Sequence, residues 1–264
     1  MTKRTKLTTA AFLTLAMFAG LGSRADAAQC GNGPGGFEAW KSQFAQEARA
    51  KGVGAAGISA LMGTTYAGAT INADRSLRSF KLSLDQFLAK RGAPAIVARG
   101  RSLKRSQAAL FASIEARYGV PAGPLIAIWG MESGFGSQRG NQNMLSSIAT
   151  LAYDCRRPEF FTEQLYAALK LVDRGALSAS SVGAAHGEIG HTQFLPGNVL
   201  KYGVGSGNLR DKATALASTA NFLKAHGWRR GASAADNIGA IAGWNDANVY
   251  QQAIVQIATA IDGD

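Results

Sequence analysis

The stretch that decides how this chain folds is "WGMESGFGSQRGN", residues 129–141, which follows directly on the apolar run "PLIAIW". Leu125, Ile128 and Trp129 precede Glu132 at the spacing i, i+3, i+4 and i+7. This spacing puts the carboxylate on the apolar stripe of a predicted helix. The small residues that follow Glu132 leave space for a bulky substrate. The sequence therefore predicts an apolar helix that ends in one ionisable group beside an open space.

Two effects act on a glutamate in that position. Removal from water favours the protonated acid, and the helix dipole disfavours a negative charge near the C-terminal end. Glu132 is thus suited to hold a proton near neutral pH and to donate it to a leaving oxygen. The alternative is a structural role, in which Glu132 pairs with a buried arginine or caps a loop.

Helical patterns dominate the rest of the chain, and alternating strand patterns are scarce, so we expect an all-α fold. The best strand candidate is "SFKLSLDQF", residues 79–87, and "CGNGPGG", residues 30–36, has the composition of a flexible leader. The predicted helices cover residues 37–52, 96–119, 121–132, 143–154, 157–175, 211–227 and 245–261.

The first 27 residues form a separate segment. A basic start, an apolar run and the small residues Ala25 and Ala27 are typical of a secretory signal peptide that is cleaved after Ala27. The run is short for a membrane anchor, and Gln29 before Cys30 does not fit a lipid-attachment signal. We therefore expect a periplasmic protein with no transmembrane segment in the mature chain.

The 264 residues carry 28 Lys and Arg against 17 Asp and Glu. Cleavage after Ala27 would remove four basic residues and one acidic residue, and the remainder would stay basic. A basic exported protein suits an anionic partner such as a wall polymer. The basic residues are scattered singly or in pairs, which argues against nucleic acid as the partner.

The chain has two cysteines, Cys30 and Cys155, and export permits a disulfide between them. The alternative is two free thiols. Two cysteines and three scattered histidines make no recognisable metal set, so we expect no metal and no cofactor.

Two further glycine-rich or polar stretches carry candidate site residues. "GEIGHTQFLPGNVLKYG", residues 187–203, offers Glu188, His191, Gln193 and Tyr202. "GWNDANVYQQA", residues 243–253, offers Trp244, Asn245 and Tyr250. Taken singly, the first stretch reads as a polar loop before a helix, and Asn245 reads equally well as a helix cap.

Taken together, five segments resemble the lytic murein transglycosylases of the membrane-bound transglycosylase B type. These segments are "AIWGMESGFG", "SSIATLAYDCRRPEFF", "GEIGHTQFLPGNVLKYGV", "ALASTANFLKAHGW" and "WNDANVYQQAI". The resemblance implies a lysozyme-like all-α catalytic core with an additional N-terminal helical lobe. We expect the catalytic domain to span residues 28–264, with the lobe at 28–118 and the core at 119–264.

The resemblance also implies a reaction. The family cleaves peptidoglycan glycan strands between N-acetylmuramic acid and N-acetylglucosamine, and leaves a 1,6-anhydromuramyl end. The nucleophile is the 6-hydroxyl of the substrate, so one acid/base, here Glu132, is sufficient. The alternatives are a goose-type-like hydrolase, in which water attacks, and a non-catalytic wall-binding or assembly protein.

The remaining site residues follow from the same resemblance. Gln193 matches a glutamine that contacts the sugars, and Asn245 and Tyr250 match residues that line the cleft. Arg156 and Arg157 match an arginine pair that is associated with the carboxylates of the stem peptide. Further candidate substrate contacts are Ser133, Glu188 and Tyr202.

One departure concerns metal. Relatives often carry an acidic calcium-binding loop, whereas residues 203–208 read "GVGSGN" and contain no carboxylate. We therefore expect no calcium. We also expect a monomer.

Overall fold

A computed structural model of the chain describes residues 28–76 and 82–263. The predicted signal peptide, residues 1–27, lies outside the described residues. The all-α prediction is confirmed. After a 3-10 turn at Pro34–Gly36, the helices are α1 (Phe37–Ala50), α2 (Ala55–Met62), α3 (Gly68–Ser76), α4 (Leu84–Arg91), α5 (Ala93–Ser106), α6 (Ala108–Tyr118), α7 (Ala122–Ser133), α8 (Met144–Tyr153), α9 (Pro158–Asp173), α10 (Pro196–Tyr202), α11 (Lys212–Ala225), α12 (Ile238–Trp244) and α13 (Asn248–Asp262).

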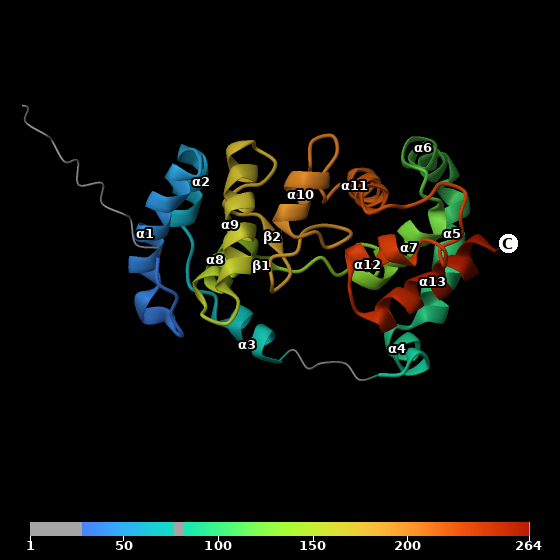
Figure 1. Cartoon of the computed structure of the whole chain (residues 1–264), viewed down its shortest axis with the longest axis horizontal. Coiled ribbons are helices and arrows are strands. Elements are labelled where there is room, and N and C mark those ends of the chain that lie inside the picture. The colour runs from blue at the N-terminus through green and yellow to red at the C-terminus, as the bar shows by residue number, and fades with distance from the viewer. Residues whose placement is uncertain (1–27, 77–81, 264) are drawn as a thin grey trace, which may run out of the picture.

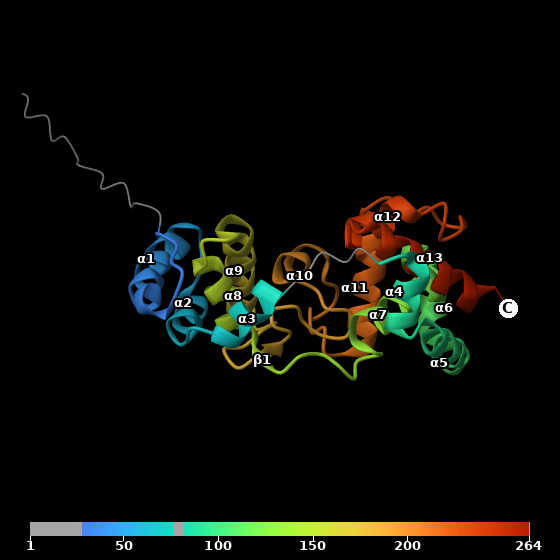
Figure 2. The same cartoon turned by 90° about the horizontal axis from the view of Figure 1, so that it is seen from below.

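The molecule is elongated and has two halves (Figures 1 and 2). Helices α1–α3 pack with α8 and α9 in one half, and α4–α7 pack with α11–α13 in the other. Strands β1 (Gln142–Asn143) and β2 (Val182–Gly183) pair antiparallel, and β1 leads directly into α8. The packing therefore does not follow the chain order. The division into a lobe and a core at residue 118 stays a prediction. In the structure, helices α4–α6 pack with α7, α11 and α13, and not with α1–α3.

Helix α7 is the centre of the second half. Every residue from Ala122 to Ser133 is buried except Glu132. The helix is apolar on all sides, which is typical of a helix surrounded by others, and α5, α6, α11 and α13 pack around it. Gly134 ends α7 with a left-handed conformation, φ 54°, that a residue with a side chain adopts at a cost. The core thus fixes where α7 stops and where Glu132 lies.

The first half is built on stacked aromatic rings. Trp40 lies 5.0 Å from Phe44 and 5.5 Å from Tyr153 between ring centroids, and Phe44 stacks on Tyr166 at 4.9 Å. These contacts join α1 to α8 and α9. The prediction of a flexible leader at 30–36 is wrong, because Gly31 donates its N–H to the carbonyl of Tyr153 at 2.9 Å and Cys30 is bonded to Cys155.

Two predicted boundaries also need correction. Residues 96–119 do not form one helix: the chain turns at Gln107, whose φ of −122° and ψ of 28° are not helical. Helix α5 packs on α7 and α13 whereas α6 packs on α11, and one straight helix would not reach both. The strand candidate at 79–87 is also wrong over Leu84–Phe87, which begin α4 after a capping box formed by Ser83 and Gln86. Residues 79–81 lie outside the described residues.

Within the described ranges, none of the helices has the length and apolar character needed to cross a bilayer.

The cysteine pair gives a first prediction. The bridge joins residues 125 positions apart, and a loop longer than a hundred residues is worth about 4 to 5 kcal/mol in the chain-entropy model. We expect Cys155→Ser and Cys30→Ser each to lower the free energy of unfolding by that amount in urea denaturation, and the double variant to lose no more. Two free thiols in the unfolded, non-reduced protein would contradict the bridge.

Candidate active site

Glu132 is held by two donors from the C-terminal helices. The hydroxyl of Tyr250, on α13, donates to Oε1 at 2.6 Å, and the indole N–H of Trp244, at the end of α12, donates to the same oxygen at 3.1 Å. Phe194 and Phe222 pack edge-on against Trp244, with centroid distances of 4.9 and 5.0 Å, and fix the indole. Because Oε1 accepts both bonds, Oε2 is the better place for the proton of the neutral acid.

The surroundings of Glu132 favour that neutral acid. Burial raises the pKa of the Glu132 carboxyl above its ordinary value, against the lowering effect of the two hydrogen bonds and of the Arg91 charge, while Glu188 raises it further. Burial and the neighbouring carboxyl also raise the pKa of Tyr250 well above 10, so its hydroxyl remains a donor. The site therefore contains a carboxylic acid that holds its proton beyond the usual pH range.

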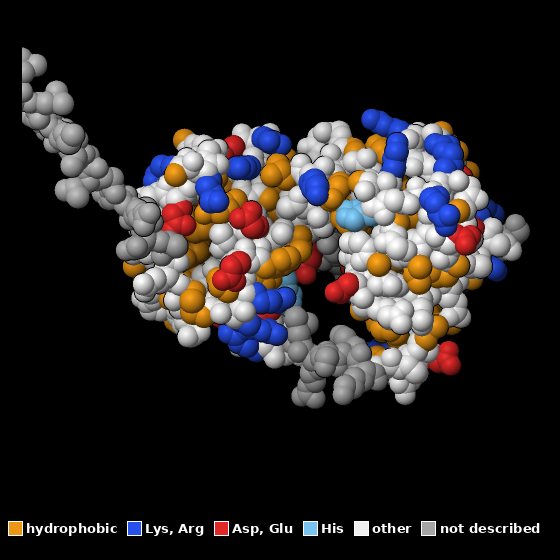
Figure 3. All heavy atoms as spheres, in the orientation of Figure 1, with side chains coloured by type: hydrophobic (Ala, Val, Ile, Leu, Met, Phe, Trp, Pro, Cys, Tyr) orange, Lys and Arg blue, Asp and Glu red, His pale blue; other side chains and the backbone are white. Residues whose placement is uncertain are grey.

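A cavity of about 500 Å³ adjoins this acid. It is lined by the α4–α5 junction, with Lys90, Arg91 and Arg99, and after α7 by Gly134, Phe135, Ser137 and Gln138. The space-filling view shows a deep hollow between the two halves, with acidic and basic side chains near its edge (Figure 3). An open space beside Glu132 is what the small residues after it predicted.

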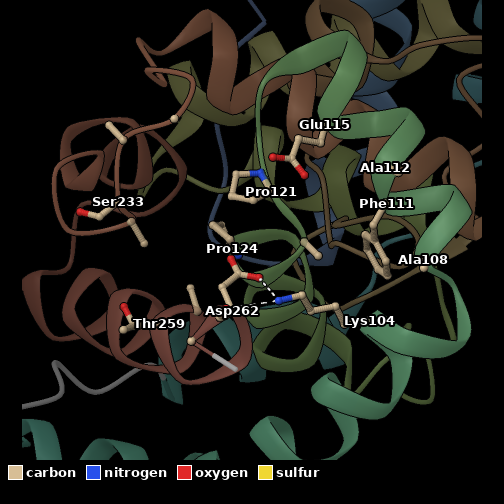
Figure 4. A pocket seen from close by; sticks show the side chains of 16 residues that line it. Lys104, Ala108, Phe111, Ala112, Glu115, Pro121, Pro124, Ser233, Thr259 and Asp262 are labelled. Carbon is tan, nitrogen blue, oxygen red and sulfur yellow. Dashed lines mark hydrogen bonds and ion pairs between the residues drawn. The ribbon is translucent and has the colours of Figure 1, made fainter.

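A larger cavity, about 730 Å³, lies at the other end of α7 (Figure 4). Its walls come from α6, the start of α7, residues 231–234 and the end of α13. The charged side chains in it include Lys104 and Asp262, which pair with each other at 3.1 Å, and Glu115. It contains none of the predicted site residues, so size alone does not identify the active site.

The profile of the family described as the transglycosylase SLT domain matches residues 36–238. The chain belongs to this family. Membrane-bound lytic murein transglycosylase B of Escherichia coli (strain K12) is 36% identical over 121 residues, which cover 43% of this chain and 34% of that protein. The aligned part thus spans about a third of that relative.

Solved structures of this kind are similar over most of the chain. SltB3 from Pseudomonas aeruginosa, in complex with NAG-NAM-pentapeptide, is 30% identical with a TM-score of 0.79, and the match covers 86% of this chain and 80% of that one. Slt35 of Escherichia coli, in complex with bulgecin A, shares the fold at 20% identity and a TM-score of 0.73, with 89% and 96% covered. The prediction of a lysozyme-like core with an added helical lobe is confirmed.

Among the residues predicted for this transglycosylase-family site, Tyr250 contacts Glu132 directly. Gln193 is half-buried with a left-handed φ of 54°, and its amide donates to the carbonyl of Gly190 at 2.8 Å. Asn245 is exposed and follows Trp244 directly. Its side-chain oxygen accepts the N–H of Ala247 at 3.0 Å, so it shapes the turn into α13.

Two predicted substrate contacts, Ser133 and Tyr202, have buried side chains in this structure, and their contact with substrate stays a prediction. Ser133 is 1% exposed, and its hydroxyl donates to the carbonyl of His191 at 2.5 Å and accepts the N–H of Gly136 at 2.9 Å. Tyr202 is 9% exposed and packs edge-on against Phe222 at 4.8 Å. Ser133 therefore holds the loop after α7, and Tyr202 belongs to the core.

Arg156 and Arg157 meet a partner within the chain. Both guanidinium groups donate to the buried carboxylate of Asp74 on α3. Burial alone would raise the pKa of Asp74, but these two hydrogen bonds and charges outweigh it and hold the pKa below its usual value. Each arginine side chain stays 41% exposed, so further contacts remain open to them.

Glu188 stands beside the same cluster. One of its oxygens accepts the backbone N–H of His186 at 3.2 Å, and the other lies 3.8 Å from the His186 ring. The ring in turn lies 3.5 Å from Asp74. Sequence reasoning named Trp244 in its stretch without giving it a role, and it did not assign Asp74 to the site. Both contact their partners across more than 80 residues of sequence, which local spacing does not reveal.

The raised pKa of Glu132 predicts a pH-dependent stability. The folded protein keeps this proton where the unfolded chain, with a pKa of about 4.3, has lost it. The stabilising contribution is therefore present below the unfolded pKa and is lost as the pH rises through the raised folded pKa. Because glutamine does not titrate, we expect Glu132→Gln to gain stability relative to the parent as the pH rises through this window.

Thermal unfolding of both proteins at a series of pH values measures this difference. The exposed Glu163 on α9 supplies the control, because Glu163→Gln should follow the parent closely. A stability difference between Glu132→Gln and the parent that does not change with pH would contradict the raised pKa.

Proposed function

We propose that this protein is a peptidoglycan lytic transglycosylase that cleaves the bond between N-acetylmuramic acid and N-acetylglucosamine. The observation that carries the proposal is the environment of Glu132: a carboxyl with a raised pKa, hydrogen-bonded through one oxygen and open to a cavity. Membership of the transglycosylase SLT domain family supports it, as does SltB3, which binds a NAG-NAM-pentapeptide.

The proposed reaction uses Glu132 twice. Its proton passes to the glycosidic oxygen as the bond between that oxygen and the anomeric carbon breaks. The 6-hydroxyl of the muramyl residue then attacks the anomeric carbon, and the Glu132 carboxylate takes the hydroxyl proton. The products are a free 4-hydroxyl and a 1,6-anhydromuramyl end, and no water is consumed. The N-acetyl group of the muramyl residue supports the positive charge that develops in between.

Tyr250 and Trp244 contribute to both steps. A carboxylate accepts stronger hydrogen bonds than a carboxylic acid, so these two donors favour the ionised form that the first step creates. Burial acts in the opposite direction and favours the acid. The opposition keeps the two forms close in free energy, which suits a group that must give and then take back a proton.

One carboxyl is sufficient in this mechanism. Glycosidases with two catalytic carboxyls use the second to attack the sugar or to activate water. Here we do not assign Glu188 a catalytic role, because its oxygens already face the backbone N–H and the ring of His186. We propose that it forms a hydrogen bond to substrate. The 6-hydroxyl of the muramyl residue is the nucleophile, so Glu188 is needed neither to attack the sugar nor to activate water.

We further propose that Gln193 and Asn245 contact the sugars, and that Arg156 and Arg157 bind carboxylates of the stem peptide through their exposed faces. The exposed part of each guanidinium supports this role. The basic balance of the chain, 28 Lys and Arg against 17 Asp and Glu, favours an anionic polymer as partner.

Export through a signal peptide over residues 1–27, to the periplasm, remains part of the proposal. So does the monomeric state.

Glu132→Gln tests the proposal, because it removes the proton and keeps the shape. We expect turnover of purified peptidoglycan to fall about 10²-fold to 10⁴-fold, the usual contribution of general acid–base catalysis. Glu115→Gln, in the remote cavity of Figure 4, is the matched control and should keep the parent rate.

Glu188→Gln should raise KM more than it lowers kcat, because we assign Glu188 a role in binding substrate.

Mass spectrometry of the released muropeptides separates the alternatives. Anhydro products are lighter by one water than the products of a goose-type-like hydrolase. Binding to insoluble wall without any released product would indicate a non-catalytic wall-binding protein, and near-parent turnover by Glu132→Gln would remove Glu132 from the mechanism.

The loop at residues 203–208 predicts indifference to calcium. Calcium takes six to eight oxygen ligands, several of them charged, and this loop offers backbone carbonyls, Ser206 and Asn208. Across the described ranges no three His, Cys, Asp or Glu side chains gather as a metal group. We expect the same thermal midpoint and the same wall-cleaving activity in chelator and in millimolar calcium. A clear rise in the midpoint with calcium would contradict this.

A further inference from the structure

We propose that His191 is a positioning residue for the catalytic end of α7, and that it performs this role only as a neutral ring with its proton on Nε2. Protonation of the ring then releases the helix end that carries Glu132 and stops the reaction in acid. The proposal rests on the function proposed above, and it adds a residue and a pH dependence that the reaction chemistry itself does not require.

The tautomer follows from one hydrogen bond. The indole N–H of Trp129, on α7, donates to Nδ1 of His191 at 3.0 Å. An indole nitrogen is a donor only, so Nδ1 must present a lone pair and cannot carry a proton. The proton of the neutral ring is therefore on Nε2, and the backbone N–H of His191 donates to the carbonyl of Leu209 at 3.0 Å. His191 thus bridges α7 to the segment that leads into α11.

The same residue contacts the end of α7 at two more points. Ser133, the neighbour of Glu132, donates its hydroxyl to the carbonyl of His191 at 2.5 Å. Gly136 packs on the ring itself, since a Cβ at that position would lie 2.3 Å from ring atoms of His191. Trp129, Ser133 and Gly136 surround Glu132 in sequence. A rotation or withdrawal of His191 therefore changes the support of the last turn of α7 and of the loop that follows it.

Charged groups near the ring decide when it protonates. Burial lowers the pKa of His191 first, the charges of Arg139 and Lys212 lower it further, and the Arg210 backbone and Asp211 act in the opposite direction. A lowered folded pKa means that the neutral ring stabilises the fold above the unfolded pKa of about 6.5 and that this stability is lost as the pH falls. Once protonated, Nδ1–H faces the indole N–H, and two donors cannot bond.

Activity should therefore fall on both sides of an optimum for different reasons. The high-pH limb follows the loss of the Glu132 proton, and the low-pH limb follows the gain of a proton by His191. In the reaction itself a lower pH favours the acid form of Glu132. A fall in activity toward acid thus needs a second group, and His191 is placed to be that group.

Three variants test the proposal with kcat, KM and the pH profile on purified peptidoglycan. In His191→Asn the side-chain oxygen can accept from Trp129 and does not titrate, so kcat at neutral pH should stay within a few fold and the low-pH limb should flatten. In His191→Leu the acceptor is lost, and kcat should fall about tenfold with little change in KM, the factor expected for one hydrogen bond. In Trp129→Phe the donor is lost, so kcat should fall as in His191→Leu, and the low-pH limb should flatten because protonation of the ring no longer breaks a bond.

A nitrogen-detected NMR spectrum of the parent gives a readout that does not depend on activity. We expect the Nε2–H tautomer for His191 at neutral pH. The Nδ1–H tautomer, an unchanged low-pH limb in His191→Asn, or a parent-like kcat in His191→Leu with an intact fold by circular dichroism would each overturn the proposal. If the parent cleaves no peptidoglycan at any pH, the proposed function fails, and the tautomer measurement still decides whether the bridge from Trp129 exists.

Discussion

The carboxyl of Glu132 is the one ionisable group on a helix that the rest of the molecule buries. Moving that group out of water has a large free-energy cost if it is charged, so the folded chain must either pair it with a cation or keep it protonated. The structure places two neutral donors, Tyr250 and Trp244, on a single oxygen, and burial raises the pKa of the carboxyl and so favours its protonated form. The raised pKa and the proposed acid/base role both follow from that arrangement.

The order of the helices along the chain explains how the two donors reach Glu132. Helix α7 ends at the middle of the molecule, the chain then leaves to build α8 and α9 in the other half, and it returns through α10 to α11–α13. Tyr250 and Trp244 come from this returning part and pack back onto α7. The loops that join the halves, including Gln193 and His191, lie along the path between them. The site combines Glu132 from α7 with Trp244 and Tyr250 from the C-terminal helices, so it forms only when the whole chain has folded.

The sequence predicted what depends on local spacing. The apolar period placed Glu132 on the apolar stripe of a helix predicted over 121–132 and near the end of that helix, which the structure ends at Ser133. It did not predict the turn at Gln107, because the packing of α5 and α6 on different partners decides it. The bond from Trp244 to Glu132, and the two arginines on Asp74, likewise depend on contacts distant in sequence. The burial of Ser133 and Tyr202 was likewise not predicted, because burial depends on how the whole chain folds.

The central claim is that the enclosure of Glu132 holds a proton on its carboxyl without preventing its release. Direct titration of the Glu132 side-chain carbonyl by carbon-13 NMR, with Glu132→Gln to assign the signal, measures this most directly. The account predicts a pKa above the ordinary glutamate value of about 4.3 in the parent, and a still higher one in Tyr250→Phe, where a donor to the carboxylate is lost. A pKa at or below the ordinary value in the parent would contradict it.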